Sequence, residues 1–154
     1  MTKDRILLGG LAGMVGNIPK ELMAWIMYWF GWIRYTFDHF CAGIFVPPAA
    51  VYDPVAIVLG LINDFVFSGI YGVLFYLIFK KTGVGRWFLK SLVMGFGLFT
   101  ICFGILRPLL APKLVVVEPL VNLLYLAPNV MYSVVTCWFI QKFGDVAKDS
   151  FNRK

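Results

Sequence analysis

Four long apolar runs, separated by short polar stretches, dominate the chain. They cover about residues 6–33, 55–79, 88–107 and 120–140. A helix needs about 20 residues to cross roughly 30 Å of hydrocarbon, so each run is long enough to span a bilayer. A transmembrane β-barrel would instead show alternating segments of about 10 residues. The pattern therefore predicts an all-α polytopic membrane protein, with four transmembrane helices in a bundle and the whole chain, 1–154, as a single integral membrane domain.

A shorter apolar pattern lies in the connection 34–53. Phe37, Phe40, Cys41 and Ile44 follow the i, i+3, i+4, i+7 spacing of one helix face. Amphipathic helices of this kind often lie in the plane of the membrane surface. The spacing predicts a short outer helix in the membrane interface.

Asp38 and His39 fall on this short helix. Consecutive residues on a helix diverge by about 100°, so the two side chains would not aim together as a catalytic pair. No nucleophile motif such as G-x-S-x-G accompanies them. We interpret them as the solvated polar face of the outer helix. The sequence therefore predicts no catalytic residue, and an enzyme is the least favoured class of function.

Composition agrees with a membrane protein. The chain is 60% apolar and 14% charged, against about 45–50% and 25% in soluble domains. The net charge of +6 comes from residues that flank the apolar runs, rather than from a basic face with aromatic platforms on a soluble module. We therefore expect the lipid bilayer, and not nucleic acid, as the partner of this chain.

The basic residues orient the predicted helices. Only three, Arg34, Arg107 and Lys113, flank them on one side. Ten lie on the other side: Lys3, Arg5, Lys80, Lys81, Arg86, Lys90, Lys142, Lys148, Arg153 and Lys154. By the positive-inside rule, we expect both termini to be cytoplasmic. We also expect a multi-pass protein of the cell membrane.

Metal and cofactor chemistry finds little support. Cys41, Cys102 and Cys137 are widely spaced, form no C-x-x-C motif and accompany a single histidine. We expect no metal site and no cofactor, and we interpret Cys102 and Cys137 as small packing residues.

Small and polar residues form one stripe along each run, because residues three and four apart share a helix face. The stripes contain Gly9, Gly13, Asn17 and Glu21; Gly60, Asp64, Ser68 and Gly72; Gly97, Thr100 and Gly104; and Asn122, Tyr125, Asn129, Ser133 and Thr136. Small residues let membrane helices approach closely, and Asn, Ser or Thr hydrogen-bond across them. Packing is the favoured interpretation of the glycines, Ser68, Ser133 and Thr136.

Lys20, Glu21 and Asp64 need more than packing. A charge deep in hydrocarbon costs roughly 2.5–3.5 kcal/mol on insertion scales, and such groups are candidates for function. One hypothesis is an internal salt bridge of Lys20 with Asp64 or Glu21. The other is a site for an ion, a proton or a small polar solute. The candidate polar centre comprises Asn17, Lys20, Glu21, Asn63, Asp64 and Asn129.

Pro19 lies in the middle of the first run. A proline removes one backbone donor and frees the carbonyl of Val15. Asn17 before it also resembles a helix N-cap. Two structures fit this pattern, a continuous helix with a proline kink or two half-helices broken at Asn17–Pro19.

The run from Lys3 to Gly9, the stretch Gly16-Asn-Ile-Pro-Lys20 and the later Asn63-Asp64-Phe65 and Gly69 resemble a group of uncharacterised small four-helix integral membrane proteins of Gram-positive bacteria. The resemblance implies the four-span fold and no substrate.

Two functions remain. The first is a transport or ion-coupled membrane component that acts as a homo-oligomer or with a membrane partner protein. The second is a structural or accessory membrane subunit, whose Lys, Asp and Glu centre only fixes the packing of the helices.

Overall fold

A computed structural model of the protein describes residues 5–114 and 118–144. These residues form helices and connections, with no strand among them. The helices in chain order are α1 (Arg5–Trp29), α2 (Phe37–Ala42), η1 (Pro48–Ala50), α3 (Pro54–Thr82), α4 (Trp87–Phe99), η2 (Thr100–Leu106), α5 (Arg107–Leu110), η3 (Pro112–Leu114), α6 (Pro119–Leu124) and α7 (Leu126–Phe143).

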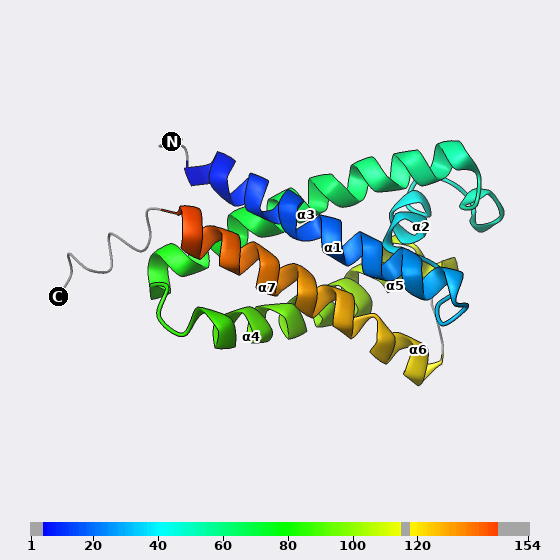
Figure 1. The fold of residues 1–154 in the computed structure, drawn as a ribbon. Coiled ribbons are helices and arrows are strands. Elements are labelled where there is room, and N and C mark those ends of the chain that lie inside the picture. Colours follow the sequence, from blue (N-terminus) through cyan, green and yellow to red (C-terminus); the bar gives the residue numbers. More distant parts are fainter. Residues whose placement is uncertain (1–4, 115–117, 145–154) are drawn as a thin grey trace.

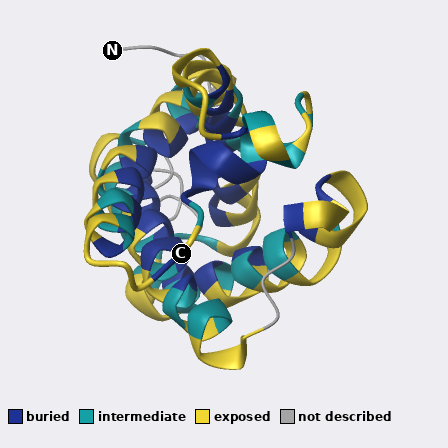
Figure 2. Ribbon diagram, turned by 90° about the vertical axis from the view of Figure 1, so that its right-hand side faces the viewer, coloured by how far each residue is buried: buried dark blue, intermediate teal, exposed yellow. Residues whose placement is uncertain are grey.

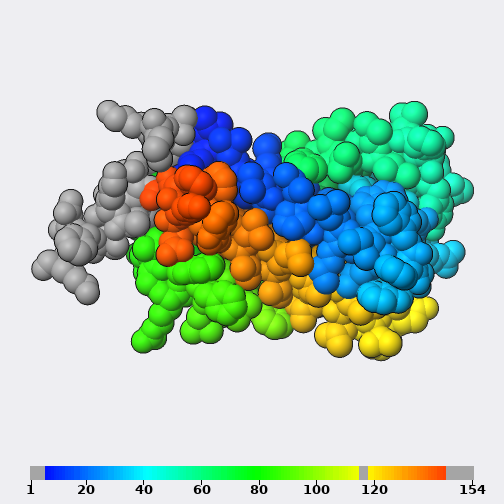
Figure 3. Space-filling view, in the orientation of Figure 1, coloured from blue at the N-terminus to red at the C-terminus, as the bar shows by residue number. Residues whose placement is uncertain are grey.

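Four long helical segments lie along one another (Figure 1). α1 packs between α3 and α7, and α7 packs on its other side against α4, whereas α3 and α4 scarcely touch. The bundle is therefore an open row in the order α3, α1, α7, α4, curved so that buried positions face inward (Figure 2). On the face shown in Figure 3, α1 and α7 lie directly against each other.

Among the described residues, three helical stretches are long and apolar enough to cross a membrane: Pro54–Thr82, Trp87–Leu110 and Pro119–Phe143. They correspond to the second, third and fourth predicted runs. α1 has a sufficient length of 25 residues, but Asn17, Lys20 and Glu21 lower its hydropathy.

α1 is one continuous helix with Pro19 inside it. Asn17 is therefore an interior residue and not an N-cap, and the two separate half-helices do not form. The helix ends at Trp29, earlier than the predicted limit at residue 33, and the turn that follows places Gly31 at a φ of 71°.

The third and fourth segments each contain an irregularity. α4 continues into η2, a π-helix of 7 residues, and then into α5. π-helical insertions are rare and often occur at functional sites. In the fourth segment the helix is interrupted at Tyr125, between α6 and α7, and Pro128 follows in the first turn of α7.

The glycines allow the helices to approach closely. A Cβ at Gly13 would collide with the backbone carbonyl of Ser68, and one at Gly72 would collide with the backbone of Gly13. A Cβ at Gly16 would similarly meet the Thr136 hydroxyl on α7. Packing is thus the role that the structure gives to these positions.

The short outer helix differs from its prediction. α2 forms where the apolar spacing places it, but it packs against α3 and buries Phe37, Phe40 and Ala42. Asp38 and His39 are buried as well, so α2 lacks the solvated polar face expected of an amphipathic helix, and its position in a membrane interface stays a prediction. Gly60 on α3 makes the contact between α2 and α3 possible, because a Cβ there would collide with the carbonyl oxygen of Asp38.

Candidate functional site

Asp64 is the centre of a buried polar network. Lys20 Nζ lies 2.8 Å from each of its carboxylate oxygens, and Asn17 Nδ2 donates to Oδ2 over 2.7 Å. The Cys41 thiol adds a long contact of 3.9 Å to Oδ1. These groups come from α1, α2 and α3, so three elements meet at one carboxylate. The hydrogen bonds satisfy Asp64 far better than apolar surroundings could.

The network extends from Asn17 to α7. Ser68 Oγ donates to Asn17 Oδ1 over 2.8 Å, and Tyr132 Oη donates to the backbone carbonyl of Ser68 over 2.6 Å. Ser68 lies one turn after Asp64 on the polar stripe of α3, which explains why one amide side chain can bridge the two residues. The polar centre therefore ties α1, α3 and α7 together.

Lys20 has two carboxylate neighbours and an aromatic one. Its Nζ lies 3.3 Å from Glu21 Oε1 and 4.2 Å from the centroid of the Phe37 ring. The Lys20 and Glu21 residues are only 5% and 6% exposed. A cation over an aromatic face is stabilised most when it is removed from water, as it is here.

Three buried carboxyl groups converge beside Lys20. Glu21, Asp38 and Asp64 each offer an oxygen, and these oxygens all lie within 4.8 Å of one another. Asp38 Oδ2 accepts a hydrogen bond of 2.9 Å from Trp25 Nε1. Both Glu21 oxygens and Asp38 Oδ1 are buried and accept no hydrogen bond from the described residues. The cluster thus combines three acidic groups with one lysine among the described residues, and three of its carboxyl oxygens accept no hydrogen bond from them.

Asp38 and His39 are both about 1% exposed, so their interpretation as a solvated polar face was wrong. The imidazole lies among the rings of Trp25, Tyr28 and Tyr52. Its Nδ1 accepts the backbone N–H of the residue before α2 over 3.1 Å. Burial lowers the pKa of His39, whereas burial raises the pKa of Asp38 against the smaller effect of the Trp25 hydrogen bond.

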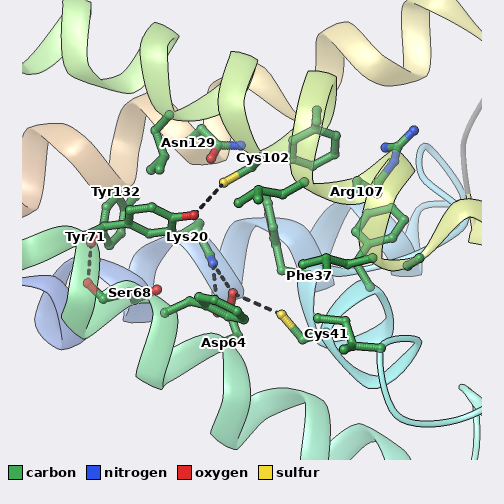
Figure 4. Close-up of a pocket in the computed structure, with 18 residues that line it drawn as sticks. Lys20, Phe37, Cys41, Asp64, Ser68, Tyr71, Cys102, Arg107, Asn129 and Tyr132 are labelled. Atoms are coloured by element: carbon green, nitrogen blue, oxygen red, sulfur yellow. Dashed lines mark hydrogen bonds and ion pairs between the residues drawn. The ribbon is translucent and has the colours of Figure 1, made fainter.

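A cavity of about 100 Å³ reaches the Lys20–Asp64 pair (Figure 4). It lies between α3 and the wall formed by α4, η2 and α5, where the row of helices is open. Ser68, Asn129 and Tyr132 add polar groups to the lining. The apolar part of the lining comprises Phe37, Phe40, Ile44, Phe67, Leu98, Phe103, Leu106, Leu110 and Ala111.

Arg107 lies at the α5 end of this cavity (Figure 4). Its guanidinium lies 4.9 Å from the ring centroids of both Phe40 and Phe103, and Nη2 donates to Asn122 Oδ1 over 3.3 Å. The sequence predicted for Arg107 only a position flanking the helices on the outer side of the membrane. Arg107 is a second cation on the cavity wall, held by aromatic rings from α2 and η2.

The structure brings together four of the six residues predicted for the polar centre: Asn17, Lys20, Glu21 and Asp64. Asn129 lines the cavity, but its Nδ2 donates to the carbonyl of Tyr125 over 2.8 Å. Asn63 is half-buried and does not line the cavity, and its Nδ2 has no hydrogen-bond partner among the described residues.

The prediction missed Asp38 and its donor Trp25. Their encounter depends on α2 folding inward, and a sequence of alternating aromatic and polar residues does not distinguish that position from a membrane surface. The one available signal was Gly60, a small residue one turn before Asp64 that leaves room for another backbone.

Comparison with known proteins gives no further assignment, because no family model, curated protein or solved structure matches the chain. The resemblance to small four-helix membrane proteins of Gram-positive bacteria stays a prediction.

Chemically, the site offers one fixed ion pair, two further carboxyl groups and an adjacent cavity. Such an arrangement can bind and release a cation or a proton beside a bound ligand. This capacity follows from the side chains themselves and requires no nucleophile.

Proposed function

We propose that the protein is an integral membrane protein of the cell membrane, with four spanning helices and cytoplasmic termini, and that it acts as a transport or ion-coupled component. α1 is the fourth spanning helix in this proposal, because its 25 residues are close to the 24 and 25 residues of two of the other three stretches and because it packs between α3 and α7. Its polar residues face inward, while Ile18 and Leu22 are exposed on its outer side.

The ends of the bundle support this orientation. The start of α1, the α3–α4 connection and the end of α7 lie at the same end (Figure 1). Lys80, Lys81, Arg86 and Lys142 lie in or beside these segments, which is the charge distribution of a cytoplasmic face. The exposed Trp29 lies at the opposite end of α1. Indole rings favour the headgroup region of a bilayer, so this position is consistent with the end of a spanning helix.

The cavity that reaches Lys20 and Asp64 is the observation that carries a transport or ion-coupled role. A centre that only locked helices together would be fully packed and would need no space beside the ion pair. Here α3 and α4 scarcely touch, and the π-helix η2 forms part of the wall between them. A ligand or ion can therefore lie directly against the buried charges.

The structural role remains a second candidate, and the contacts of Asp64 favour it. This carboxylate is fully engaged by Lys20 and Asn17, which join α1 to α3. A buried, completely hydrogen-bonded ion pair can fix the register of two helices without moving anything.

The native cysteines allow a direct test. Cys102 lines the cavity, whereas Cys137 is fully buried in the core and lies outside the cavity. Two variants would each keep one of these thiols, with the other two cysteines replaced by alanine. In liposomes, a small hydrophilic thiol reagent should modify the Cys102 variant and spare the Cys137 variant. Modification should also abolish ion flux, measured after a proton, Na⁺ or K⁺ gradient is imposed.

Equal labelling of the two variants would mean that the reagent does not report on the cavity, and the Cys102 result would then carry no weight. Failure to label a correctly folded Cys102 variant, together with absence of flux in the unmodified wild type, would contradict the transport role. That combination would leave the structural role as the better explanation.

A further inference from the structure

We propose that Glu21 and Asp38 form a proton-binding site in which their facing carboxyl groups share a proton beside the Lys20–Asp64 ion pair. The inference deepens the proposed function, and it rests on that function only in naming the proton as the coupled ion. The binding site itself stands on the geometry of the cluster.

The first argument is charge balance. Lys20 supplies one positive charge to a buried cluster of Glu21, Asp38 and Asp64, and it contacts both oxygens of Asp64. With all carboxyl groups ionised, two negative charges would be uncompensated in a region shielded from water. Burial of an unpaired ion costs several kcal/mol, so such groups take up a proton or bind a cation.

The second argument is the set of unsatisfied oxygens. Both oxygens of Glu21 and Oδ1 of Asp38 are buried and accept no hydrogen bond from the described residues. Glu21 is 6% exposed and Asp38 is 1% exposed, and oxygens of the two side chains lie within 4.8 Å of each other. A proton on one carboxyl group supplies the missing donor to the other, since a protonated carboxyl is both donor and acceptor.

The third argument favours a proton over a divalent metal. Lys20 Nζ already occupies both oxygens of Asp64 and lies 3.3 Å from Glu21 Oε1. A metal ion would have to share these oxygens with an ammonium group. Ca²⁺ requires 6–8 oxygen ligands, and Mg²⁺ requires near-octahedral geometry. The Glu21–Asp38 pair would leave most of these positions to water, although the two residues are only 6% and 1% exposed, whereas a proton needs a single donor and acceptor.

The groups that face this pair define its behaviour. From α1 come Lys20 and the indole of Trp25, and from α3 comes Asp64. The Cys41 thiol of α2 contacts Asp64 Oδ1 over 3.9 Å. In the loaded state, the O–H of one carboxyl group donates to the other carboxylate. On release, that O–H bond breaks, the proton passes to water and both groups are carboxylates. Lys20 keeps its proton throughout.

Infrared difference spectroscopy on the purified protein tests the site. The carbonyl stretch of a protonated carboxyl group should be present at neutral pH and should disappear as the pH is raised. Glu21→Gln and Asp38→Asn should each abolish this signal. Asp53→Asn should leave it unchanged, because Asp53 is an exposed N-cap residue of α3 whose carboxylate accepts from the Val55 N–H.

Several results would overturn the proposal. One is the absence of the protonated signal in the wild type at neutral pH. Another is its persistence unchanged in either folded single variant. A third is a clear increase in Tm on addition of Ca²⁺ or Mg²⁺ that both variants lose, which would identify a metal site instead. If a variant does not fold, the wild-type titration still decides whether a protonated carboxyl group is present, and the other variant decides whether it belongs to this pair.

The proton site and the proposed function can fail separately. A protonated Glu21–Asp38 pair without any flux in liposomes would retain the site and reject the coupled transport. If modification of Cys102 blocks flux but no protonated carboxyl signal is found, the transport role is retained and the proton site is rejected.

Discussion

Removal of the Lys20 ammonium should destabilise the protein more than neutralisation of Asp64. Lys20→Met leaves Glu21, Asp38 and Asp64 together with no cation, although the methionine keeps most of the side-chain volume. Removing one partner of a buried ion pair typically costs about 3–5 kcal/mol. Asp64→Asn instead leaves Lys20 with Glu21, 3.3 Å away, and preserves the shape of the side chain.

The expected cost of Asp64→Asn is therefore only about 1–3 kcal/mol, which is typical of a weakened buried hydrogen-bond network. The double variant should lose less free energy of unfolding than the two single variants lose together. With both charges removed, neither the ammonium of Lys20 nor the carboxylate of Asp64 is left without its partner. The cost of Lys20→Met should also decrease at lower pH, because protonation of the carboxyl groups relieves their repulsion.

Equilibrium unfolding in detergent micelles, followed by circular dichroism, gives these free energies. Lys113→Met is the matched control, because Lys113 is exposed and the substitution removes the same charge. The reasoning fails if Lys20→Met costs no more than Lys113→Met, or if Asp64→Asn costs more than Lys20→Met. Strictly additive effects would mean that the two residues do not stabilise each other.

Two further predictions follow from the packing and from the buried imidazole. Gly13→Ala should destabilise the protein by about 1–3 kcal/mol, because the new Cβ would collide with the Ser68 carbonyl. Gly97→Ala is the control, because a Cβ there meets nothing within 4 Å, and it should not be destabilising in the same unfolding assay. The NMR signal of His39, the single histidine, should titrate below its ordinary pKa of about 6.5. Because the unfolded state then binds the proton first, stability should fall as the pH decreases through that value, and His39→Gln should remove this part of the slope.

The helical architecture was largely predictable because its signal is local. Continuous apolar runs specify helices of spanning length, and the 3.6-residue period aligns Asn17, Lys20 and Glu21 on α1 with the stripe that contains Asp64 on α3. Counting residues from the helix ends also predicted that Lys20 and Asp64 lie at similar depths in adjacent helices. These contacts formed as the sequence predicted.

The position of α2 was not predictable in the same way. An apolar face with i, i+3, i+4, i+7 spacing buries itself equally well in a membrane surface or against another helix, so the pattern around Phe37 and Phe40 does not separate the two. The choice depends on Gly60, which lets the backbone of Asp38 approach α3. Tertiary packing of this kind involves residues far apart in the chain.

The inward position of α2 also changes which function the charges support. Without it, Lys20 would have two acidic partners, Asp64 and Glu21. By bringing Asp38 against Glu21, α2 adds a third carboxyl group to a centre that contains one lysine. A structural lock gains nothing from this excess, because unpaired buried charge is destabilising. An ion-binding centre requires it, since the excess charge is what attracts the ion. The same helix also supplies Phe37 to the cavity wall and over the Lys20 ammonium, so α2 contributes both to the charge imbalance and to the lining of the cavity.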